Sequence, residues 1–544
     1  MIAVVCLNVN GQTVVLPSVK AFLTANGYGR NATGGRGGVI IPVTNNNDAG
    51  PGSLRAALID SRTRIITFRV SGTINLSNYI NVGNDNFTIA GETAPGQGIQ
   101  IDGSGGIQIT ASNWIIRHIR FRGSNVISNL RVITSNGVVE DGIIDHCSFS
   151  WPDPDEMNIS IEATSANGNV QARDITVQNC ILGEATRGML LYKGHYRISI
   201  YRNYFANTQQ RCINANRPLW IPDGELSFEE INCIAHNTQI EMIQASYGTK
   251  FTAIGNKRTN ASGSYTSSAK TIVDVYTLPG EDGDWADTYI YENDNLNTLS
   301  GGSIYDGSTA GYIFGSRYAS SDITGDLILP VADIDDMLST LGAFYWNRDA
   351  VDTRYINDYL NNTGSIGTYS GTPPALSSGS NYPDADSDGM DDDWETLHSV
   401  TTRDQVNSSY VIDGITYNNA AGWTAMDIFL AERASDFDNL PGDPVGGSAP
   451  TFTNSGYEVY NVMVGSTYTP PTVTAYDADD GDITDDIVIT GTVNTSVVGT
   501  YYVYYDVSDS DSNSIQLVIT VNVLPIPVPG KGKWINSNVL FTLD

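Results

Sequence analysis

Basic residues are few in this chain of 544 residues: 29 Lys and Arg stand against 60 Asp and Glu, which gives a formal net charge of −31. Proteins that bind DNA or RNA need a basic surface to meet the phosphates. Proteins that are held at anionic membranes need one too. The composition therefore argues against nucleic acid and against a membrane surface as general partners.

Long apolar runs are also missing, since no segment reaches the ~20 apolar residues that a membrane-spanning helix requires. The apolar start, MIAVVCLNVNGQ from Met1, is short and has no Lys or Arg before it, so it makes a poor signal peptide. We expect an extracellular protein whose leader is missing, or one that leaves its cell by another route, for instance within a phage virion.

Cysteine is scarce, and no two cysteines form a CxxC pair, which argues against zinc and redox motifs. An odd number of cysteines fits small buried hydrophobic side chains better than a disulfide framework. The cysteines are Cys6, Cys147, Cys180, Cys212 and Cys233.

Short β-branched segments separated by turns fill the first 330 residues, and helical patterns there are scarce. Five segments look alike, and matching one residue of each gives offsets of 28, 33, 24 and 29 residues. The matched residues are Ile119, Cys147, Cys180, Tyr204 and Cys233. A repeat of this length predicts a right-handed parallel β-helix, in which each coil stacks on the last.

Residue parity agrees with stacked strands, because Cys147 and Phe149 share one face of their segment. Arg117 lies one coil from Asp145, which predicts a buried ion pair between them. The alternative, in which Asp145 lies on an exposed loop, stays open.

Other parts of the chain do not follow this repeat of short strands. Helices are predicted in GSLRAALIDS from Gly52, which could cap the solenoid, and in AMDIFLAERA from Ala425. After about Asp333, IDDMLSTLGAF and RDAVDTRYINDYL are predicted to be helical or mixed segments. Residues 449–523 hold ten acids, no Lys or Arg and several strand patterns, as in a small β-sandwich.

The predicted fold class is all-β, with a right-handed parallel β-helix followed by a small calcium-loop region and an immunoglobulin-like β-sandwich. The predicted boundaries are 1–370 for the β-helix and 371–448 for a linker with the calcium loop and a short helix. The sandwich follows at 449–523, and a linker and tail at 524–544.

The segment DADSDGMDDDWE has the ligand spacing of an EF-hand calcium loop. Carboxylates stand at positions 1, 3, 5, 9 and 12, a carbonyl is offered at position 7, and a glycine at position 6 allows the sharp turn. The ligands would be Asp384, Asp386, Asp388, Met390, Asp392 and Glu395. The alternative is a solvated acidic linker.

Two stretches contain bases and no acid. The first holds Arg187, Lys193, Arg197, Arg202, Arg211 and Arg217. The second holds Arg117, Arg120, Arg122 and Arg131. In a chain of such negative charge they predict a cleft that binds an anionic ligand, with a polyanionic sugar as the natural candidate. The alternative is that these bases pair with acids on neighbouring coils.

The acids Asp153, Asp155 and Glu156 lie on a predicted turn one coil before the first basic stretch. They could hold a calcium ion that also binds a substrate carboxylate. They could instead act as acid and base in glycoside hydrolysis, or merely neutralise nearby arginines.

Several motifs, in a shared order along residues 17–435, resemble those of the pectate lyase family. They are NGYGRNATGGRGG from Asn26, VTNNNDAGPGSLRAAL from Val43, IAGETAPGQGI from Ile89, IIDHCSFSW from Ile143, and RDAVDTR from Arg348. The resemblance implies calcium-dependent β-elimination on an acidic, uronate-containing polysaccharide. It also implies that an arginine removes the C5 proton.

The resemblance also suggests residue roles. Arg211 would be the base. Arg187 or Lys193 would bind the substrate carboxylate, since this chain has Arg187 where the family often has a lysine. Arg217 would supply a second basic contact, since the family's RxPR-like element reads RCINANRP here. We also expect Arg202, Arg197 and His146 at the substrate. A second calcium would use Asp155 and Glu156, with Asn129 nearest to a family aspartate that is missing here.

Residues 449–523 resemble bacterial immunoglobulin-like modules, which space or attach other domains. Three alternatives to a lyase stay open. One is a phage tailspike or receptor-binding protein, as a homotrimer or virion component, that binds and trims a host glycan. The others are a non-catalytic β-helix adhesin and a hydrolase with two carboxylates.

Overall fold

The structure is a computed structural model, and it describes most of the chain. The described residues are 13–123, 126–153, 156–163, 170–216, 226–246, 248–260, 271–276, 287–305, 309–366, 373–412, 415–439, 451–454, 459–477, 481–508 and 514–525. The chain forms two compact units, Met1–Phe437 and Asp438–Asp544. Cys6 and Arg217 lie outside the described residues, as do Asp155 and residues 526–544 of the predicted tail.

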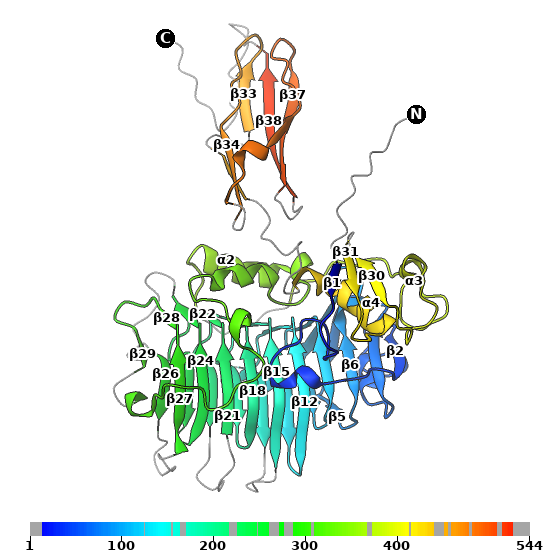
Figure 1. Cartoon of the computed structure of the whole chain (residues 1–544), viewed down its shortest axis with the longest axis vertical. Helices are drawn as coiled ribbons and strands as arrows, with labels where there is room; N and C mark the ends of the chain where they lie inside the picture. The colour runs from blue at the N-terminus through cyan, green and yellow to red at the C-terminus, as the bar shows by residue number, and fades with distance from the viewer. Residues whose placement is uncertain are drawn as a thin grey trace. The chain divides into compact units, whose positions relative to one another are not determined.

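Three parallel sheets build the first unit, and each coil contributes one strand to each sheet in turn (Figure 1). We name each sheet after its first strand. The β2 sheet contains β2 (Val39–Val43), β3 (Arg64–Phe68), β6 (Phe87–Ala90), β9 (Trp114–Arg117), β12 (Val138–Asp145), β15 (Gln171–Gln178), β18 (His195–Tyr201), β21 (Leu226–Ile231), β24 (Thr249–Ile254) and β27 (Tyr289–Asn293).

The other two sheets follow the same order. The β4 sheet contains β4 (Gly72–Leu76), β7 (Ile99–Gly103), β10 (Ile119–Phe121), β13 (Ser148–Ser150), β16 (Ile181–Gly183), β19 (Tyr204–Ala206), β22 (Ile234–His236), β25 (Lys257–Thr259) and β28 (Leu296–Asn297). The β5 sheet contains β5 (Ile80–Val82), β8 (Ile107–Ile109), β11 (Ser128–Thr134), β14 (Met157–Ala163), β17 (Arg187–Tyr192), β20 (Arg211–Asn216), β23 (Ile243–Ser246), β26 (Thr271–Tyr276) and β29 (Ser303–Tyr305).

The interior of the coil is filled by alternate residues of each strand, which stack on their counterparts in the next coil. Ile144 is aligned with Ile116 on one side and with Val177 on the other. The rings of Phe121 and Phe149 stack with their centroids 4.8 Å apart. The parallel β-helix that the repeat predicted is confirmed.

From His118 onward, each coil turns from the β2 sheet to the β4 sheet through one residue with a positive φ of about the same value. These turn residues include His118, His146, Asn179, Arg202 and Asn232, with φ between 46° and 54°. The left-handed region lets the chain reverse its pleat within one residue. Polar side chains thus occupy this position for a structural reason.

From Cys147 onward, the residue after the turn residue belongs to a polar ladder. The N–H of Cys180 donates to Oδ1 of Asn203 at 2.9 Å, and the N–H of Cys233 donates to Oδ1 of Asn256 at 2.8 Å. Tyr204 pairs with Ile181, so Asn203 takes the place of the cysteines. The predicted alignment of Tyr204 with Cys180 was wrong by one residue, because the ladder accepts either thiol or amide.

Other segments cover the outer faces of two sheets. Phe22 and Ala25 of the N-terminal segment pack on Ile115 and Ile143 of the β2 sheet. The helix α2 (Ala350–Leu360) and the segment before it pack on the β4 sheet. The other α-helices of the described residues are α1 (Leu54–Leu58), α3 (Asp392–His398) and α4 (Ala425–Arg433). The predicted helical segments match α1, α2 and α4, and IDDMLSTLGAF forms a 3₁₀ helix over Ile334–Thr340.

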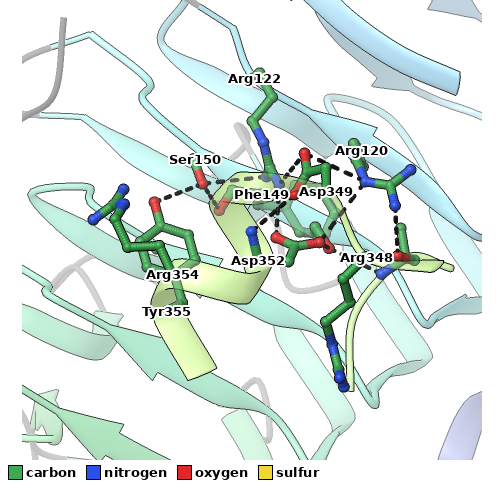
Figure 2. Close-up of polar contacts among 12 residues, drawn as sticks. Arg120, Arg122, Phe149, Ser150, Arg348, Asp349, Asp352, Arg354 and Tyr355 are labelled. Carbon is green, nitrogen blue, oxygen red and sulfur yellow. Dashed lines mark hydrogen bonds and ion pairs between the residues drawn. The ribbon is translucent and has the colours of Figure 1, made fainter. Parts of the chain in front are cut away.

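Buried ion pairs fasten α2 to the β4 sheet (Figure 2). Arg122, directly after β10, is fully buried, and its Nη2 lies 2.6 Å from Oδ1 of Asp352. Ser148 donates to the other carboxylate oxygen of Asp352 at 2.6 Å, and Asp349 caps the N-terminus of α2. The acids of RDAVDTR therefore hold α2 against the outer face of the β4 sheet.

A second buried network ties the C-terminal part of this unit to the coil. Arg117 lies 2.8 Å from Asp145, as predicted, and 2.6 Å from Asp436. Burial works against the ionised form of Asp145, but the charges of His146 and Arg117 outweigh it and lower the pKa of that carboxyl. The exposed-loop alternative for Asp145 is wrong, since this side chain is fully buried.

The domain boundary that we predicted at residue 370 differs from the structure. The strand β1 (Thr13–Val15) pairs with β31 (Ile415–Asn418), which pairs with β30 (Ser409–Ile412). Arg36 binds Asp427 of α4 at 2.8 Å. Residues 373–437 therefore belong to the β-helix unit, because the chain folds back and pairs with its own beginning.

The second unit is a small β-sandwich. One sheet contains β32 (Thr451–Asn454), β34 (Val473–Asp477) and β35 (Gly481–Asp482). The other contains β33 (Val459–Met463), β36 (Val488–Thr490), β37 (Gly499–Ser508) and β38 (Ser514–Leu524). Val473 of the first sheet packs against Val503 and Ile519 of the second.

Within the described part of the chain, no helix combines the length and the apolar character that crossing a membrane demands.

The Asp352 network gives a first prediction. Asp352→Ala should lower the free energy of unfolding by about 3–5 kcal/mol, because it removes the closer of the two carboxylates that compensate the buried charge of Arg122. Urea denaturation followed by circular dichroism measures the loss. Arg62→Ala, which removes a surface ion pair, should leave the transition unchanged. An equal effect of both substitutions would contradict the prediction.

A buried acid gives a second prediction. Glu230 points into the coil interior, where burial raises the pKa of its carboxyl to about 8. Between about pH 4.5 and pH 8 the folded state keeps a proton that the unfolded state loses, so stability falls as pH rises, by about 1.4 kcal/mol per pH unit.

Glu230→Gln stays neutral at every pH, so its advantage in stability over the wild type should be larger at pH 8 than at pH 5. Urea denaturation of both proteins at the two pH values measures this difference. The same advantage at both pH values would show that Glu230 does not titrate in this window.

Candidate active site on the β5 sheet

The outer face of the β5 sheet carries polar side chains along neighbouring coils. Its inward residues, such as Ile213 and Ala215, belong to the core. The outward residues that alternate with them line up in register: Arg131, Ser160, Leu190, Asn214, Gln244 and Asp274. A row of this kind offers hydrogen-bond donors and acceptors along the coil axis.

An extra inward residue at the start of β20 turns the preceding side chain outward. Cys212 and Ile213 are consecutive, both lie in the core, and their N–H groups both donate to the carbonyl of Met242. Two residues opposite one define a β-bulge. The side chain of Arg211 therefore lies on the outer face, where it is 19% exposed.

A second row of charged residues runs along these strand starts. Arg187 and Arg211 are register partners in adjacent coils. The N–H of Arg187 donates to the carbonyl of Glu156 in the coil before, and Arg211 lies beside Glu241 in the coil after. Along the axis the register thus runs through Met157, Arg187 and Arg211, with the Glu241 carboxylate beside Arg211 in the next coil.

Glu241 is a residue that the sequence interpretation missed. Its Oε2 lies 3.5 Å from Nε of Arg211, and its side chain is 7% exposed. The coil period would have revealed it, because Tyr204 pairs with Ile234 thirty residues later, and Glu241 follows Arg211 by the same interval.

Other predicted site residues lie elsewhere in the coil. Lys193 follows the last residue of β17, at the opposite end of that strand from Arg187, roughly 20 Å away for six residues at ~3.3 Å each. Arg197 lies in β18 of the β2 sheet, in an ion pair with Asp174. The predicted single cleft formed by all these bases is therefore not present among the described residues.

Arg202 and His146 occupy the turn between the β2 and β4 sheets. His146 is 4% exposed, stacks on His118 with ring centroids 5.1 Å apart, and lies 2.8 Å from Asp145. The structure therefore does not bring either residue to the Arg211 row, because both serve the turn. Arg217 was expected beside Arg211 and lies outside the described residues.

The second basic stretch is mostly buried and paired. Arg117, Arg120 and Arg122 are each at most 2% exposed and contact carboxylates, while Arg131 pairs with Glu162. The alternative interpretation, that bases pair with acids on neighbouring coils, holds for Arg117 with Asp145 and for Arg131 with Glu162. Arg120 and Arg122 instead pair with acids of the segment that covers the β4 sheet.

The predicted calcium ligands beside the arginines are not assembled by the described residues. Glu156 is the residue directly before β14, and Asp155 lies outside the described residues. Asn129 is 2% exposed, and its Oδ1 accepts the N–H of Gly123 at 3.0 Å. Its amide nitrogen donates to the carbonyl of Ser150 at 3.0 Å. Asn129 therefore does not fit a ligand on this face, because its amide is used internally.

The acidic loop before α3 does bring its carboxylates together. Two groups of oxygen atoms each converge within 4.8 Å, one from Asp384, Asp386 and Asp388 and one from Asp386, Asp392 and Glu395. Burial and the neighbouring acids raise the pKa of Glu395 to about 7. Gly389 turns the loop with a φ of 94°. This donor set fits a hard cation such as calcium.

The arrangement of the Arg211 row sets limits on its chemistry. Two guanidinium groups in adjacent coils can bind anionic groups that follow one another along a polymer, since strands lie ~4.8 Å apart. The Glu241 carboxylate beside Arg211 offsets part of this positive charge. The row is therefore suited to an elongated anion rather than to a single phosphate or sulfate.

Comparison with known proteins finds relatives of this chain. Residues 452–523 match the family model described as "Bacterial surface protein, Ig-like domain". Proteins named "Probable pectate lyase C" are similar to the first unit. The one from Aspergillus terreus is 30% identical over 395 residues, which cover 69% of this chain and 87% of that protein. The one from Emericella nidulans is 28% identical over 73% of this chain and 90% of that protein.

Solved structures with the same kind of coil are more distant. "Pectate lyase bound to hexasaccharide" has 15% identity and a TM-score of 0.43, over 61% of this chain and 98% of that chain. Pectate lyase C from Erwinia chrysanthemi, determined with Ca²⁺, has 15% identity and a TM-score of 0.37, over 60% and 99%. The fold assignment thus depends on the strand pairing itself. From the parallel coil, the order of its motifs and 30% identity over most of a relative's length, this chain belongs to the pectate lyase family.

Proposed function

We propose that this pectate lyase-like enzyme cleaves a uronate-containing polysaccharide by β-elimination at the Arg187–Arg211 row of the β5 sheet. The observation that supports this most is the register of these two arginines, on the outer face of a coil that belongs to a lyase family. A uronate polymer carries one carboxylate per sugar, which suits a row of cations along the coil axis.

The two arginines have different parts in the proposed reaction. Arg187 binds the carboxylate of the sugar that is cut, which withdraws charge and makes the proton on C5 more acidic. Arg211 lies one coil further and faces that proton. The double bond forms between C4 and C5, and the sugar linked at C4 leaves.

Replacement of Arg211 tests the assignment. Arg211→Ala should lower kcat for unsaturated uronate formation from polygalacturonate by about 10²-fold or more, because it removes the group that faces C5. Ultraviolet absorbance of the new double bond measures the rate. Arg173→Ala, which removes an ion-paired arginine of the β2 sheet, should leave the rate unchanged.

Three results would contradict the proposal. A folded Arg211→Ala protein with full activity would end the role of Arg211. New reducing ends without unsaturated product would indicate the hydrolase alternative. Binding without any product, across a panel of acidic polysaccharides, would indicate the adhesin.

We further propose that the acidic loop holds a structural calcium ion, through the carboxylates of Asp384, Asp386, Asp388, Asp392 and Glu395 and the carbonyl of Met390. The ion would neutralise acids that otherwise repel one another. It would also fix the start of α3, whose Trp394 packs on Phe429 of α4.

Calcium should therefore stabilise the β-helix unit. At a concentration of 100 times Kd, the free energy of unfolding should rise by about 2.7 kcal/mol. Asp386→Asn should abolish the effect, and Asp393→Asn, which removes the same charge from a residue outside the ligand spacing, should retain it. A melting temperature that does not respond to calcium or chelator would contradict the prediction.

The pKa of Glu395 near 7 adds a pH dependence to this binding. Below pH 7 a proton competes with calcium for Glu395, so affinity should fall by up to tenfold per pH unit. Isothermal titration at pH 6 and pH 8 measures the change. Equal affinity at both pH values would show that Glu395 is not a ligand.

An extracellular location suits this function, because a polysaccharide is too large to enter a cell. The similarity of residues 452–523 to a domain of bacterial surface proteins also favours it. A homotrimer carried by a phage virion stays a prediction, and the mass of the full chain in solution would test the trimer.

A further inference from the structure

A lone arginine is a poor base for the proposed elimination. The guanidinium pKa lies above 12, so almost no neutral arginine exists near pH 7. A group that takes a proton works best when its pKa is close to the working pH. The reaction therefore needs another group to which the proton can pass.

Glu241 is placed to be that group. Its Oε2 lies 3.5 Å from Nε of Arg211, one coil further along the same row. This distance is longer than a hydrogen bond, but catalytic contacts often tighten only when substrate is bound. Gln244 donates to the same oxygen of Glu241 at 3.4 Å, and also to Asp274 at 3.4 Å, which holds the carboxylate in place.

The surroundings of Glu241 favour proton uptake. Its side chain is nearly buried, and burial is the main reason that the pKa of this carboxyl is raised. Asp274 of β26 raises the pKa further, while Arg211 of β20 and Arg258 of β25 lower it. The net shift brings the acid closer to neutral pH than an exposed glutamate.

We propose that Glu241 is the proton acceptor behind Arg211, so that the base of the elimination is the Arg211–Glu241 pair. This inference deepens the proposed function and rests on it. In this proposal Glu241 does not contact the substrate. It acts through Arg211 and is in that sense a positioning residue.

The proton movements balance. Arg211 passes the proton of Nε–H to Oε2 of Glu241. A solvent water moves a proton from one Nη of Arg211 to the vacated Nε, which leaves a lone pair on that Nη, and this lone pair takes the proton from C5. The electron pair of the C5–H bond forms the C4–C5 double bond. The bond from C4 to the leaving oxygen breaks, and that oxygen takes a proton from water. Glu241 then gives its proton to the hydroxide left by this water.

The pH profile of the reaction tests the inference. In the wild type, kcat/KM on polygalacturonate should rise with pH through the titration of Glu241 and then level. In Glu241→Gln, kcat should fall by about 10²-fold or more, with KM changed by less than about threefold. The remaining rate of the Glu241→Gln variant should keep rising with pH, because the carboxylate whose titration levels the wild-type profile is absent.

Two further variants serve as controls. Glu241→Asp keeps a carboxylate and should keep a profile that levels, with a reduced kcat. Glu140→Gln removes the same charge from a glutamate of β12 that also binds an arginine, Arg173. It lies on the β2 sheet, away from the Arg211 row, and its profile should match that of the wild type.

Several outcomes would overturn the inference. A folded Glu241→Gln protein with wild-type activity and profile would do so. A lower kcat with an unchanged shape of the profile would also do so, because it would show a purely structural role. If the wild type forms no unsaturated product, the proposed function fails first. Circular dichroism and melting temperature establish that each variant is folded.

Discussion

Parallel pairing of each coil with the next is the constraint on which the rest of this protein depends. It places equivalent residues of successive coils directly beside one another, whatever the length of the loop between them. Residues 24 or 30 positions apart in sequence thereby become neighbours, as Arg187, Arg211 and Glu241 do. The same rule builds the interior stacks and the polar ladder at the turn. The candidate site is therefore one more ladder, with charged side chains on the outside of the coil in place of apolar ones inside.

Much of the fold could be predicted from the sequence because the coil repeats local rules. Alternating apolar residues and frequent turn signals predict short stacked strands, and the EF-hand spacing predicts a loop whose carboxylates meet. The register between neighbouring coils was harder to predict. Cys180 and Asn203 fill equivalent places because thiol and amide both accept a backbone N–H there, and matching by residue type moved the alignment by one. The return of residues 373–437 to the β-helix depends on long-range pairs such as Arg36–Asp427, which no local pattern reveals.

The candidate site was predicted only in part, for a related reason. A basic stretch in sequence passes through all three sheets within one coil, so its members point in different directions. Arg197 and Arg202 belong to this stretch but lie on the β2 sheet and in the next turn. Only Arg187 and Arg211, of the described bases in the stretch, share one row. Position within the coil, which follows from the repeat period, is the better predictor of a shared surface. Applied after Arg211 as well as before it, that period leads to Glu241.

The extent of burial distinguishes arginines that stabilise the fold from Arg211 in the candidate site. Arg117, Arg120 and Arg122 give up their hydration, and each is compensated by carboxylates of a segment that packs on the coil. They bind parts of the protein to one another and have no capacity left for a substrate. Arg211 keeps partial exposure and has a single carboxylate beside it, at a distance that leaves room for a proton to move between them when substrate closes the row. An arginine that is fully paired stabilises the fold. One that is incompletely paired, next to an acid whose pKa is raised, can take part in a reaction.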